Sequence, residues 1–424
     1  MIRILRKLIP KKYFETVQKT YHWLFALFSA VWYRFPSQEI KVVAITGTKG
    51  KTTSTELVSA LLEAGGYKTA IISTLRFKIA DQSQRNLLKM TTPGKGLMQK
   101  MLREAVKTKC DYAILELSSE GAKLYRHAFI DLDALIFTNL SPEHIESHGS
   151  YENYVKAKLS IAHALERSPK SNKVLVVNND DTEANKFLAL KIETKLSFSL
   201  TQIEPYELTE SGAILTIGGQ KIKSLLPGIF NIYNVLGAIT YAQSQGIKLE
   251  DIRAGLENFS GVLGRMQKVY SKQYREKQNF DVIVDYAHTA ESLKAAYSVY
   301  SGKKRLICVF GATGGGRDKW KRPAMGKVAN DHCDKIILTN DDPYEEDPDQ
   351  IVCEIATGIE KNYDVIIDRR AAIREAIREA QAGDVVMLTG KGTDPYLMEA
   401  GSKKTPWNDA QIVEEELDSL LAKK

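Results

Sequence analysis

The sequence predicts an α/β protein with a central P-loop domain, built on a mostly parallel sheet, and a C-terminal Rossmann-like α/β domain. Short apolar runs alternate with helical stretches along most of the chain, which is typical of parallel strands with helices on both faces of a sheet. A glycine-rich turn directly follows the first of these runs. The 424 residues exceed what one ordinary hydrophobic core holds, so we expect at least two domains.

The central domain is expected to open with a strand at Lys41–Thr46, a glycine turn and a helix from Thr52 to Glu63. Four further apolar runs predict buried strands with helices between them: Ala70–Ser73, Tyr112–Leu117, Ala134–Thr138 and Val174–Asn178. Residues 190–225 differ, because glycine, serine and threonine stand among short alternating runs. This pattern indicates an antiparallel β excursion.

A polar, charged stretch at residues 271–279 marks the entry to the second domain. The strands predicted there are Val282–Asp285, Leu306–Phe310, Lys335–Thr339, Asp364–Ile367 and Val385–Thr389. We therefore divide the chain into an N-terminal helical segment (1–38), a central domain (39–264) and a C-terminal domain (265–424).

Nearly all of the excess positive charge lies in the N-terminal segment. Residues 1–38 contain seven lysines and arginines and one acidic residue, which accounts for +6 of the net +7. The rest of the chain is close to balanced, so we expect no nucleic-acid partner. The segment also carries an apolar run at Trp23–Trp32, much shorter than the roughly twenty residues that cross a bilayer. Two interpretations stay open: a helix that packs its aromatic side on the next domain, and a basic amphipathic contact with the inner face of a membrane.

The four cysteines, Cys110, Cys308, Cys333 and Cys353, lie far apart and form no CxxC motif. This spacing suits a reducing cytoplasm and argues against a zinc ribbon or a disulfide scaffold.

Residues 47–53 read Gly-Thr-Lys-Gly-Lys-Thr-Thr, between a predicted strand and a predicted helix. Glycines let the backbone wrap around an anion, and the N–H groups of the first helical turn point at it. Lys51 brings a positive charge to the terminal phosphates, and Thr52 or Thr53 can place a hydroxyl on Mg²⁺. The loop is shorter than the usual GxxxxGK[ST] consensus, but strand, turn and helix occur in the required order. We therefore predict a bound nucleoside triphosphate.

Two further strand ends carry groups that bind hard cations. Glu116 closes one predicted strand, and His144 follows the next one. Open α/β sheets bind their ligands at the carboxyl ends of the strands. A carboxylate and a histidine beside a phosphate loop can share Mg²⁺, although each alone is more often a helix cap or a surface group.

In this order the motifs resemble those of the Mur ligases, most closely the MurE type, which adds the third residue of the stem peptide to a UDP-N-acetylmuramoyl dipeptide. The match runs from about Val42 to the last fifteen residues. In the central domain it rests on Thr46–Thr53, Phe137–Leu140, His144, His148, Gly149, Tyr154, Lys158 and Asn231–Asn234. In the C-terminal domain it rests on Asp285–Thr289, Arg317–Lys319, Lys321–Pro323, Thr339–Pro343 and Gly390–Gly392.

The resemblance implies that ATP phosphorylates a carboxylate of the precursor and that an amine then displaces phosphate. It assigns ATP binding to Gly47, Thr48, Lys49, Gly50, Lys51, Thr52, Thr53, Asn231, Asn234, Arg265, Asp285 and His288. It assigns catalysis to Lys51, Glu116, His144 and Lys158, and Mg²⁺ to Thr52, Glu116, His144 and Lys158. Lys158 would be the lysine that the family carbamylates.

Substrate binding is expected at Thr91, Thr92, Ser118, Arg126, Asp341, Asp342, Tyr344, Gly390 and Asp394. Three departures affect this set. The family's N-terminal domain, which holds the uridine, is much longer than the 38 residues that precede the core here, so uridine recognition is lost, rebuilt or transferred to another carrier. The family's Ser-Ser-His reads Ser-Ser-Glu at 118–120. Tyr344 stands where diaminopimelate enzymes carry an arginine, which favours lysine or another amine whose ammonium Asp394 can meet.

We therefore expect a monomeric, cytoplasmic ligase that adds lysine, diaminopimelate or a similar amino acid to UDP-N-acetylmuramoyl-L-alanyl-D-glutamate. Its expected ligands are small molecules, ATP and Mg²⁺, with a peripheral membrane contact through residues 1–38 left open. One alternative is a related ligase for another acceptor, of the poly-γ-glutamate, folate or cyanophycin type. Another is a nucleotide-binding scaffold that has lost ligation.

Overall fold

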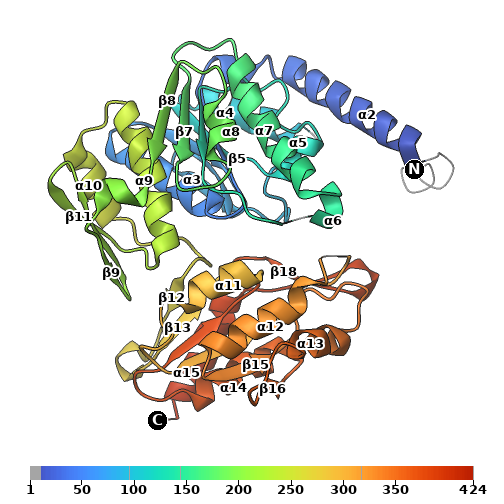
Figure 1. Ribbon diagram of the computed structural model, residues 1–424, viewed down its shortest axis with the longest axis vertical. Helices are drawn as coiled ribbons and strands as arrows, with labels where there is room; N and C mark the ends of the chain where they lie inside the picture. Colours follow the sequence, from blue (N-terminus) through green and yellow to red (C-terminus); the bar gives the residue numbers. More distant parts are fainter. Residues whose placement is uncertain (1–10, 95, 144, 317, 424) are drawn as a thin grey trace. The chain divides into compact units, whose positions relative to one another are not determined.

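The computed structural model describes residues 11–423 apart from 95, 144 and 317, with side chains from residue 18 onward (Figure 1). The chain forms two compact units. Unit 1 holds the described residues up to Tyr206, together with Leu215–Ser224 and Asn231–Phe259. Unit 2 holds Glu207–Ile214, Leu225–Phe230 and the described residues from Ser260 onward. No helix in the described ranges is long and apolar enough to cross a membrane.

Unit 1 is built on an eight-stranded sheet. In sheet order its strands are β4 (Gln82–Arg85), β3 (Arg76–Ile79), β2 (Thr69–Ile72), β5 (Tyr112–Glu116), β1 (Lys41–Thr46), β6 (Ala134–Phe137), β7 (Val174–Asn178) and β8 (Thr194–Phe198). In this sheet order the six strands β2, β5, β1, β6, β7 and β8 run parallel, whereas β3 and β4 form an antiparallel edge. The central strands are buried on both faces, which explains why their sequences are continuous apolar runs.

Helices cover both faces of this sheet. One face packs against α4 (Leu97–Lys107), α5 (Ser119–Lys123), α7 (Tyr151–Arg167) and α8 (Ala184–Leu188). The other face packs against α3 (Lys51–Ala64) and α9 (Ile229–Ser244), and α10 (Leu249–Glu257) lies on α3. A long helix, α2 (Lys11–Trp32), and a short 3₁₀ turn at Pro36–Gln38 precede β1. Residues 1–10 of the predicted helical segment lie outside the described residues.

The antiparallel excursion predicted for residues 190–225 was wrong in its first part. Thr194–Phe198 forms β8, a parallel edge strand of the main sheet. Its burial alternates because an edge strand is covered less completely than a central one, so its sequence resembles that of an antiparallel strand. The antiparallel sheet itself consists of β9 (Glu207–Thr209), β10 (Gly212–Ile217) and β11 (Gln220–Ser224).

Unit 2 contains a six-stranded sheet. In sheet order its strands are β12 (Gln267–Val269), β13 (Asp281–Val284), β17 (Val385–Leu388), β14 (Leu306–Phe310), β15 (Lys335–Leu338) and β16 (Asp364–Val365). All strands from β13 to β16 in this order are parallel, and β12 pairs antiparallel with β13. One face packs against α11 (Ala290–Tyr297), α12 (Lys321–His332) and α13 (Pro348–Ala356). The other packs against α14 (Arg369–Glu379) and α15 (Asp409–Leu421), and a hairpin, β18 (Tyr396–Glu399) and β19 (Lys403–Pro406), follows β17.

A disulfide joins Cys308 on β14 to Cys333 at the end of α12. Both cysteines are buried in the core of unit 2, while Cys110 and Cys353 are free thiols. The cysteine spacing argued against a disulfide scaffold, and this single pair lies inside an ordinary hydrophobic core. The two residues meet only because α12 packs back against β14, which their sequence spacing does not show.

Candidate functional site

The phosphate loop lies between β1 and α3, as its sequence predicted. Gly50 adopts a left-handed conformation with φ of 82° at the start of α3. A Cβ atom at Gly50 would lie 2.2 Å from Oδ1 of Asn234, and one at Gly47 would lie 1.9 Å from Oγ1 of Thr138. Both positions therefore require glycine, because other parts of unit 1 approach the loop backbone directly.

This close approach leads to a prediction about stability. Gly50→Ala is expected to destabilise the protein by about 1–3 kcal/mol more than Gly66→Ala. Gly66 has a similar φ of 87°, but no described atom lies within 4 Å of the place that its Cβ would take, so it shares the backbone strain without the clash. Urea unfolding of both variants measures the difference, and equal free energies of unfolding would contradict the prediction.

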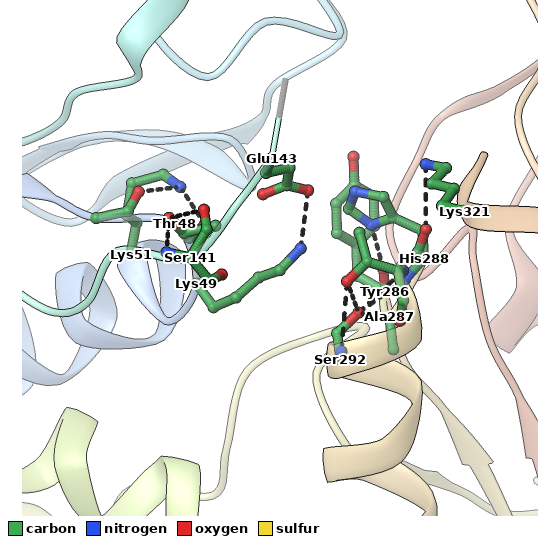
Figure 2. A network of polar contacts seen from close by, with 12 residues as sticks. Thr48, Lys49, Lys51, Ser141, Glu143, Tyr286, Ala287, His288, Ser292 and Lys321 are labelled. Atoms are coloured by element: carbon green, nitrogen blue, oxygen red, sulfur yellow. Dashed lines mark hydrogen bonds and ion pairs between the residues drawn. The ribbon is translucent and has the colours of Figure 1, made fainter. Parts of the chain in front are cut away.

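Several polar contacts hold the loop in shape (Figure 2). Lys51 Nζ donates to the carbonyl oxygens of Gly47 and Thr48, each at 3.0 Å. The hydroxyl of Thr48 lies 2.8 Å from that of Tyr154 on α7. Lys49 forms an ion pair of 2.9 Å with Glu143. The side chain of Lys51 thus lies across the carbonyl groups of its own loop.

Glu116 is buried at the carboxyl end of β5, next to the first turn of α3. Thr52 Oγ1 lies 3.1 Å from both of its carboxylate oxygens, and Thr74 donates to it through its amide at 2.8 Å and its hydroxyl at 2.9 Å. The prediction from sequence did not include Thr74. It follows β2, so the rule that ligands gather at the carboxyl ends of parallel strands would have indicated it.

Lys158 points from α7 toward the same loop and is fully buried. Its ammonium donates to the carbonyl oxygen of Gly47 and lies 5.4 Å from the centre of the Tyr154 ring. Burial, together with the positive charge of Lys51, lowers the pKa of Lys158 well below the usual lysine value, against the opposing effect of Glu143 and Glu116. Thr52 on α3, Glu116 on β5 and Lys158 on α7 therefore meet at the phosphate loop.

His144, which the sequence placed in the metal site, and Arg317, which is part of the C-terminal motifs of the resemblance, lie outside the described residues. Among the residues that are described, no group of three histidine, cysteine, aspartate or glutamate side chains is arranged to hold a metal ion. The oxygen atoms of Thr52 and Glu116 are nevertheless the hard donors that suit Mg²⁺ beside phosphates.

The two asparagines assigned to the adenine lie on α9, and both are buried. Asn234 donates to Asn231 at 3.0 Å and accepts a hydrogen bond from Ser54 on α3 at 3.2 Å. This arrangement places the pair directly beside Gly50, at the end of the phosphate loop where α3 begins.

The residues of unit 1 assigned to the substrate gather around the end of β5. The Thr92 hydroxyl donates to the carbonyl of Glu116 at 3.1 Å and accepts the amide hydrogen of Ser118 at 2.9 Å. Arg126 donates to the carbonyl oxygen of Thr92. Thr91 joins the same network through Thr74, at 2.9 Å.

Glu120, the residue that departs from the family motif, pairs with His148. The His148 Nε2 atom lies 3.1 Å from its carboxylate, and this contact is the main reason why the pKa of Glu120 is lowered to about 2. The His148 ring lies 5.4 Å from that of Tyr154, so the pair adjoins the helix that carries Lys158. The sequence indicated both residues separately but not their contact.

In unit 2, Arg265, Asp285 and His288 lie around the turn after β13. Figure 2 shows Tyr286, Ala287 and His288 of this turn. The Arg265 guanidinium lies 4.3 Å from the centre of the Tyr286 ring, and His288 Nδ1 lies 2.8 Å from the Tyr286 carbonyl oxygen. Asp285 accepts hydrogen bonds of 2.7 Å from the amides of Met266 and Ala287. These contacts fix the turn at the carboxyl end of β13.

A buried cluster of charges follows β15 and β17. Lys391 Nζ lies 2.7 Å from Asp342, 3.6 Å from Asp341 and 3.5 Å from Asp394. Burial raises the pKa of Asp341, although Lys391 acts in the opposite direction. A Cβ atom at Gly390, whose φ is 106°, would lie 2.8 Å from the Asp341 carboxylate, so glycine allows the backbone to pass this close.

Two further features of unit 2 lie beside this cluster. Tyr344 has a positive φ of 53° and donates its amide to Met398 on the β18–β19 hairpin at 3.1 Å. Arg369 and Asp409 form a fully buried ion pair of 2.7 Å, and Arg369 also donates to the carbonyl of Thr389. The prediction from sequence missed this pair, because its members are 40 residues apart and belong to no motif.

Two family models match the chain. The model of the Mur ligase middle domain covers residues 45–242, and that of the Mur ligase glutamate ligase domain covers residues 264–392. The UDP-N-acetylmuramoyl-L-alanyl-D-glutamate–2,6-diaminopimelate ligase of Syntrophomonas wolfei is 38% identical over 386 residues, which are 88% of this chain and 77% of that protein. The UDP-N-acetylmuramyl-tripeptide synthetase of Roseiflexus sp. is 34% identical, over 90% of this chain and 79% of that protein.

Solved structures show the same likeness. A UDP-N-acetylmuramoyl-L-alanyl-D-glutamate–2,6-diaminopimelate ligase matches with a TM-score of 0.61 and 30% identity, over 90% of this chain and 79% of that one. A folylpolyglutamate synthase from Mycobacterium tuberculosis matches with a TM-score of 0.68 over 87% of this chain and 92% of that one. At 15% identity, this second match concerns the fold alone.

Proposed function

The chain belongs to the Mur ligase family of ATP-dependent amide ligases, and we propose that it adds a diamino acid to UDP-N-acetylmuramoyl-L-alanyl-D-glutamate in peptidoglycan synthesis. The observation that carries the proposal is the group of Lys51, Thr52, Glu116 and Lys158 around one glycine loop. The names of relatives that are 32–38% identical support the acceptor and the reaction.

The reaction that we propose has two steps. The carboxylate of the acceptor attacks the γ-phosphorus of ATP, which forms an acyl phosphate and releases ADP. The neutral amine then attacks the acyl carbon, the C–O bond to phosphate breaks, and the amine loses a proton. A carboxylate is a poor electrophile, and phosphorylation supplies the leaving group that amide formation needs.

The residues of the loop neutralise the charge that develops in these steps. Lys51 and the amides of the first turn of α3 bind the phosphates. Thr52 and Glu116 would hold Mg²⁺, which when bound screens the phosphate oxygens and polarises the phosphorus. Thr92, Ser118 and Arg126 orient the acceptor carboxylate at the end of β5.

Lys158 is proposed to act as a carbamate. Its lowered pKa favours the neutral amine, whose nitrogen can attack CO₂ with loss of a proton. The product is a carboxylate in place of a buried ammonium, close to the loop carbonyl of Gly47. Such a carboxylate would add a third oxygen donor to those of Thr52 and Glu116 for Mg²⁺.

Phosphate release tests the proposed function directly. Purified protein is incubated with Mg-ATP and the UDP-linked dipeptide, with lysine, meso-diaminopimelate or ornithine added in turn. We expect release that requires both the acceptor and one amine. Release with a folate or a polyglutamate acceptor instead would support the alternative acceptors, and ATP binding without release on any acceptor would support the scaffold.

The choice of amine is proposed to depend on Tyr344, because the family's diaminopimelate enzymes carry an arginine there. Tyr344→Arg is expected to raise the preference for meso-diaminopimelate over lysine, in kcat/KM, by about tenfold, since a charge-assisted hydrogen bond contributes roughly 1.5 kcal/mol or more. Tyr344→Gln is the control, because it offers hydrogen bonds without a positive charge. An equal change of preference in both variants would contradict a role of the guanidinium.

The last part of the proposal concerns the oligomeric state, the location and the partners of the protein. We propose a monomer that works in the cytoplasm on small-molecule substrates and binds no nucleic acid. The balanced charge of residues 39–424 supports the last point.

A further inference from the structure

One face of α2 exposes a continuous row of large apolar side chains. The row, called here the α2 stripe, consists of Tyr21, Leu24, Phe28, Val31 and Trp32, and each of them is more than half exposed. Their spacing of three or four residues, with Val31 and Trp32 adjacent, places them along one side of a helix. Figure 1 shows the N-terminal part of α2 extending beyond the sheet and helices of unit 1.

The opposite face of α2 already packs on unit 1. Ser29 and Ala30 are buried, and the Trp23 ring lies 5.2 Å from that of Phe129. Arg103 on α4 donates to the carbonyl oxygens of Tyr33 and Arg34 just after the helix, at 2.9 and 3.0 Å. The stripe is therefore directed outward by contacts that hold the C-terminal half of the helix.

A loop of unit 1 close to Arg126 also exposes apolar side chains. Leu87, Leu88 and Met90 are exposed, and Met90 Sδ lies 3.7 Å from a guanidinium nitrogen of Arg126. A Cβ atom at Gly94 would lie 3.4 Å from Arg126, and one at Gly96 would lie 2.9 Å from Ser29 on the buried side of α2. The arginine is therefore close to the packed side of the helix. Nine of the sixteen large hydrophobic side chains that are exposed in the described part of the chain belong to α2 and this loop.

Basic residues accompany the apolar ones. Lys19 and Arg34, which come before and after the stripe in the sequence, are exposed. The sequence adds Arg3, Arg6, Lys7, Lys11 and Lys12 before it, with Glu15 as the one acidic residue among the first 38. Exposed apolar rings beside a net charge of +6 match a surface that is negatively charged and has an apolar interior. Two copies of this segment would repel each other, which argues against self-association through it.

We propose that the α2 stripe binds the surface of an anionic lipid bilayer, with α2 lying in the interface. Aromatic and aliphatic side chains would enter the headgroup region while lysine and arginine contact anionic lipids. The binding itself does not depend on the proposed ligase reaction.

Vesicle flotation of the full chain tests this proposal. We expect the protein to float with phosphatidylcholine vesicles that contain about one third phosphatidylglycerol, and to stay behind with phosphatidylcholine alone. Raising the salt concentration should weaken binding because the lysine and arginine contacts are screened. Leu24→Glu/Phe28→Glu is expected to lower the bound fraction by about tenfold or more.

The matched control is Leu208→Glu/Val365→Glu, which adds the same charge at exposed apolar residues elsewhere and should float like the unaltered protein. Equal flotation of both double variants, or no flotation of the unaltered protein, would overturn the proposal. A dimer in light scattering that only the α2 variant disrupts would also overturn it, because a second copy would then occupy the stripe. Turnover on the soluble UDP-linked acceptor should be the same in the α2 variant, so a failure here is distinct from a failure of the proposed reaction.

Discussion

Lys158→Ala is expected to lower amine-dependent phosphate release by about a thousandfold or more, which is the loss seen when a group that stabilises transition-state charge is removed. Lys158 is buried against the phosphate loop and donates to the carbonyl oxygen of Gly47. The measurement is the initial rate of phosphate release with Mg-ATP, the UDP-linked dipeptide and the preferred amine. Retention of more than about a tenth of the turnover would contradict the assignment.

The control variants test whether Lys158 acts as a carbamate or only as a positive charge. Lys158→Arg keeps the charge but does not react with CO₂, so it should be as inactive as the alanine variant. A short carboxylic acid such as acetate or propionate should partly restore Lys158→Ala, because it supplies the missing carboxylate. Lys156→Ala, an exposed lysine on the same helix, should stay within about twofold of the unaltered protein.

The lowered pKa of Lys158 also predicts a pH dependence. Above this pKa the amine is neutral and can form the carbamate, and below it the ammonium predominates and cannot react. Turnover should therefore fall as the pH decreases through the lowered pKa, and added bicarbonate should oppose the fall. A pH profile that does not respond to bicarbonate would contradict the carbamate but not the position of Lys158 in the site.

Lys51→Met is expected to lower kcat/KM for ATP by about 10²–10³, because the variant keeps the length of the side chain but removes the charge that faces the phosphates. Its ammonium donates to the carbonyl oxygens of Gly47 and Thr48, so it lies within the predicted phosphate loop. ATP binding by calorimetry and phosphate release under saturating amine give the loss of binding and of turnover separately.

Lys68→Met serves as the control for this variant, since Lys68 is exposed in the same unit and also donates to a backbone carbonyl. Its kinetics should be unchanged, and the thermal midpoints of both variants should agree with that of the unaltered protein. Turnover of Lys51→Met within about threefold of normal would exclude a direct role of this lysine.

The strands next to the site were predictable because burial leaves a simple pattern. β1, β5, β6 and β7 are covered by helices on both faces, so each is an uninterrupted apolar run of the length of a strand. The phosphate loop was predictable for a different reason. Gly47 and Gly50 allow approaches that a Cβ atom would block, and such a requirement is visible in the residue type itself.

Contacts between distant residues were not predictable in the same way. The pairing of Glu120 with His148, of Arg369 with Asp409 and of Cys308 with Cys333 leaves no periodic pattern in the sequence. Thr74 belongs to no sequence motif, and it contacts Glu116 only because the fold places the end of β2 beside β5. The prediction for the edge strand β8 was wrong because antiparallel strands share its alternating burial.

The sequence by itself determined the alternation of strands and helices, the phosphate loop and the resemblance to one ligase family, because each of these is expressed in residue type and local spacing. Only the tertiary structure decided how deeply Lys158 is buried, because β1, α7 and the loop exclude water from it together. This burial in turn lowers the pKa of Lys158. It also decided which side of α2 stays exposed. The sequence places aromatic residues on all sides of that helix, so it does not show which side is exposed. Because Ser29 and Ala30 pack on unit 1, the stripe on the other side faces outward.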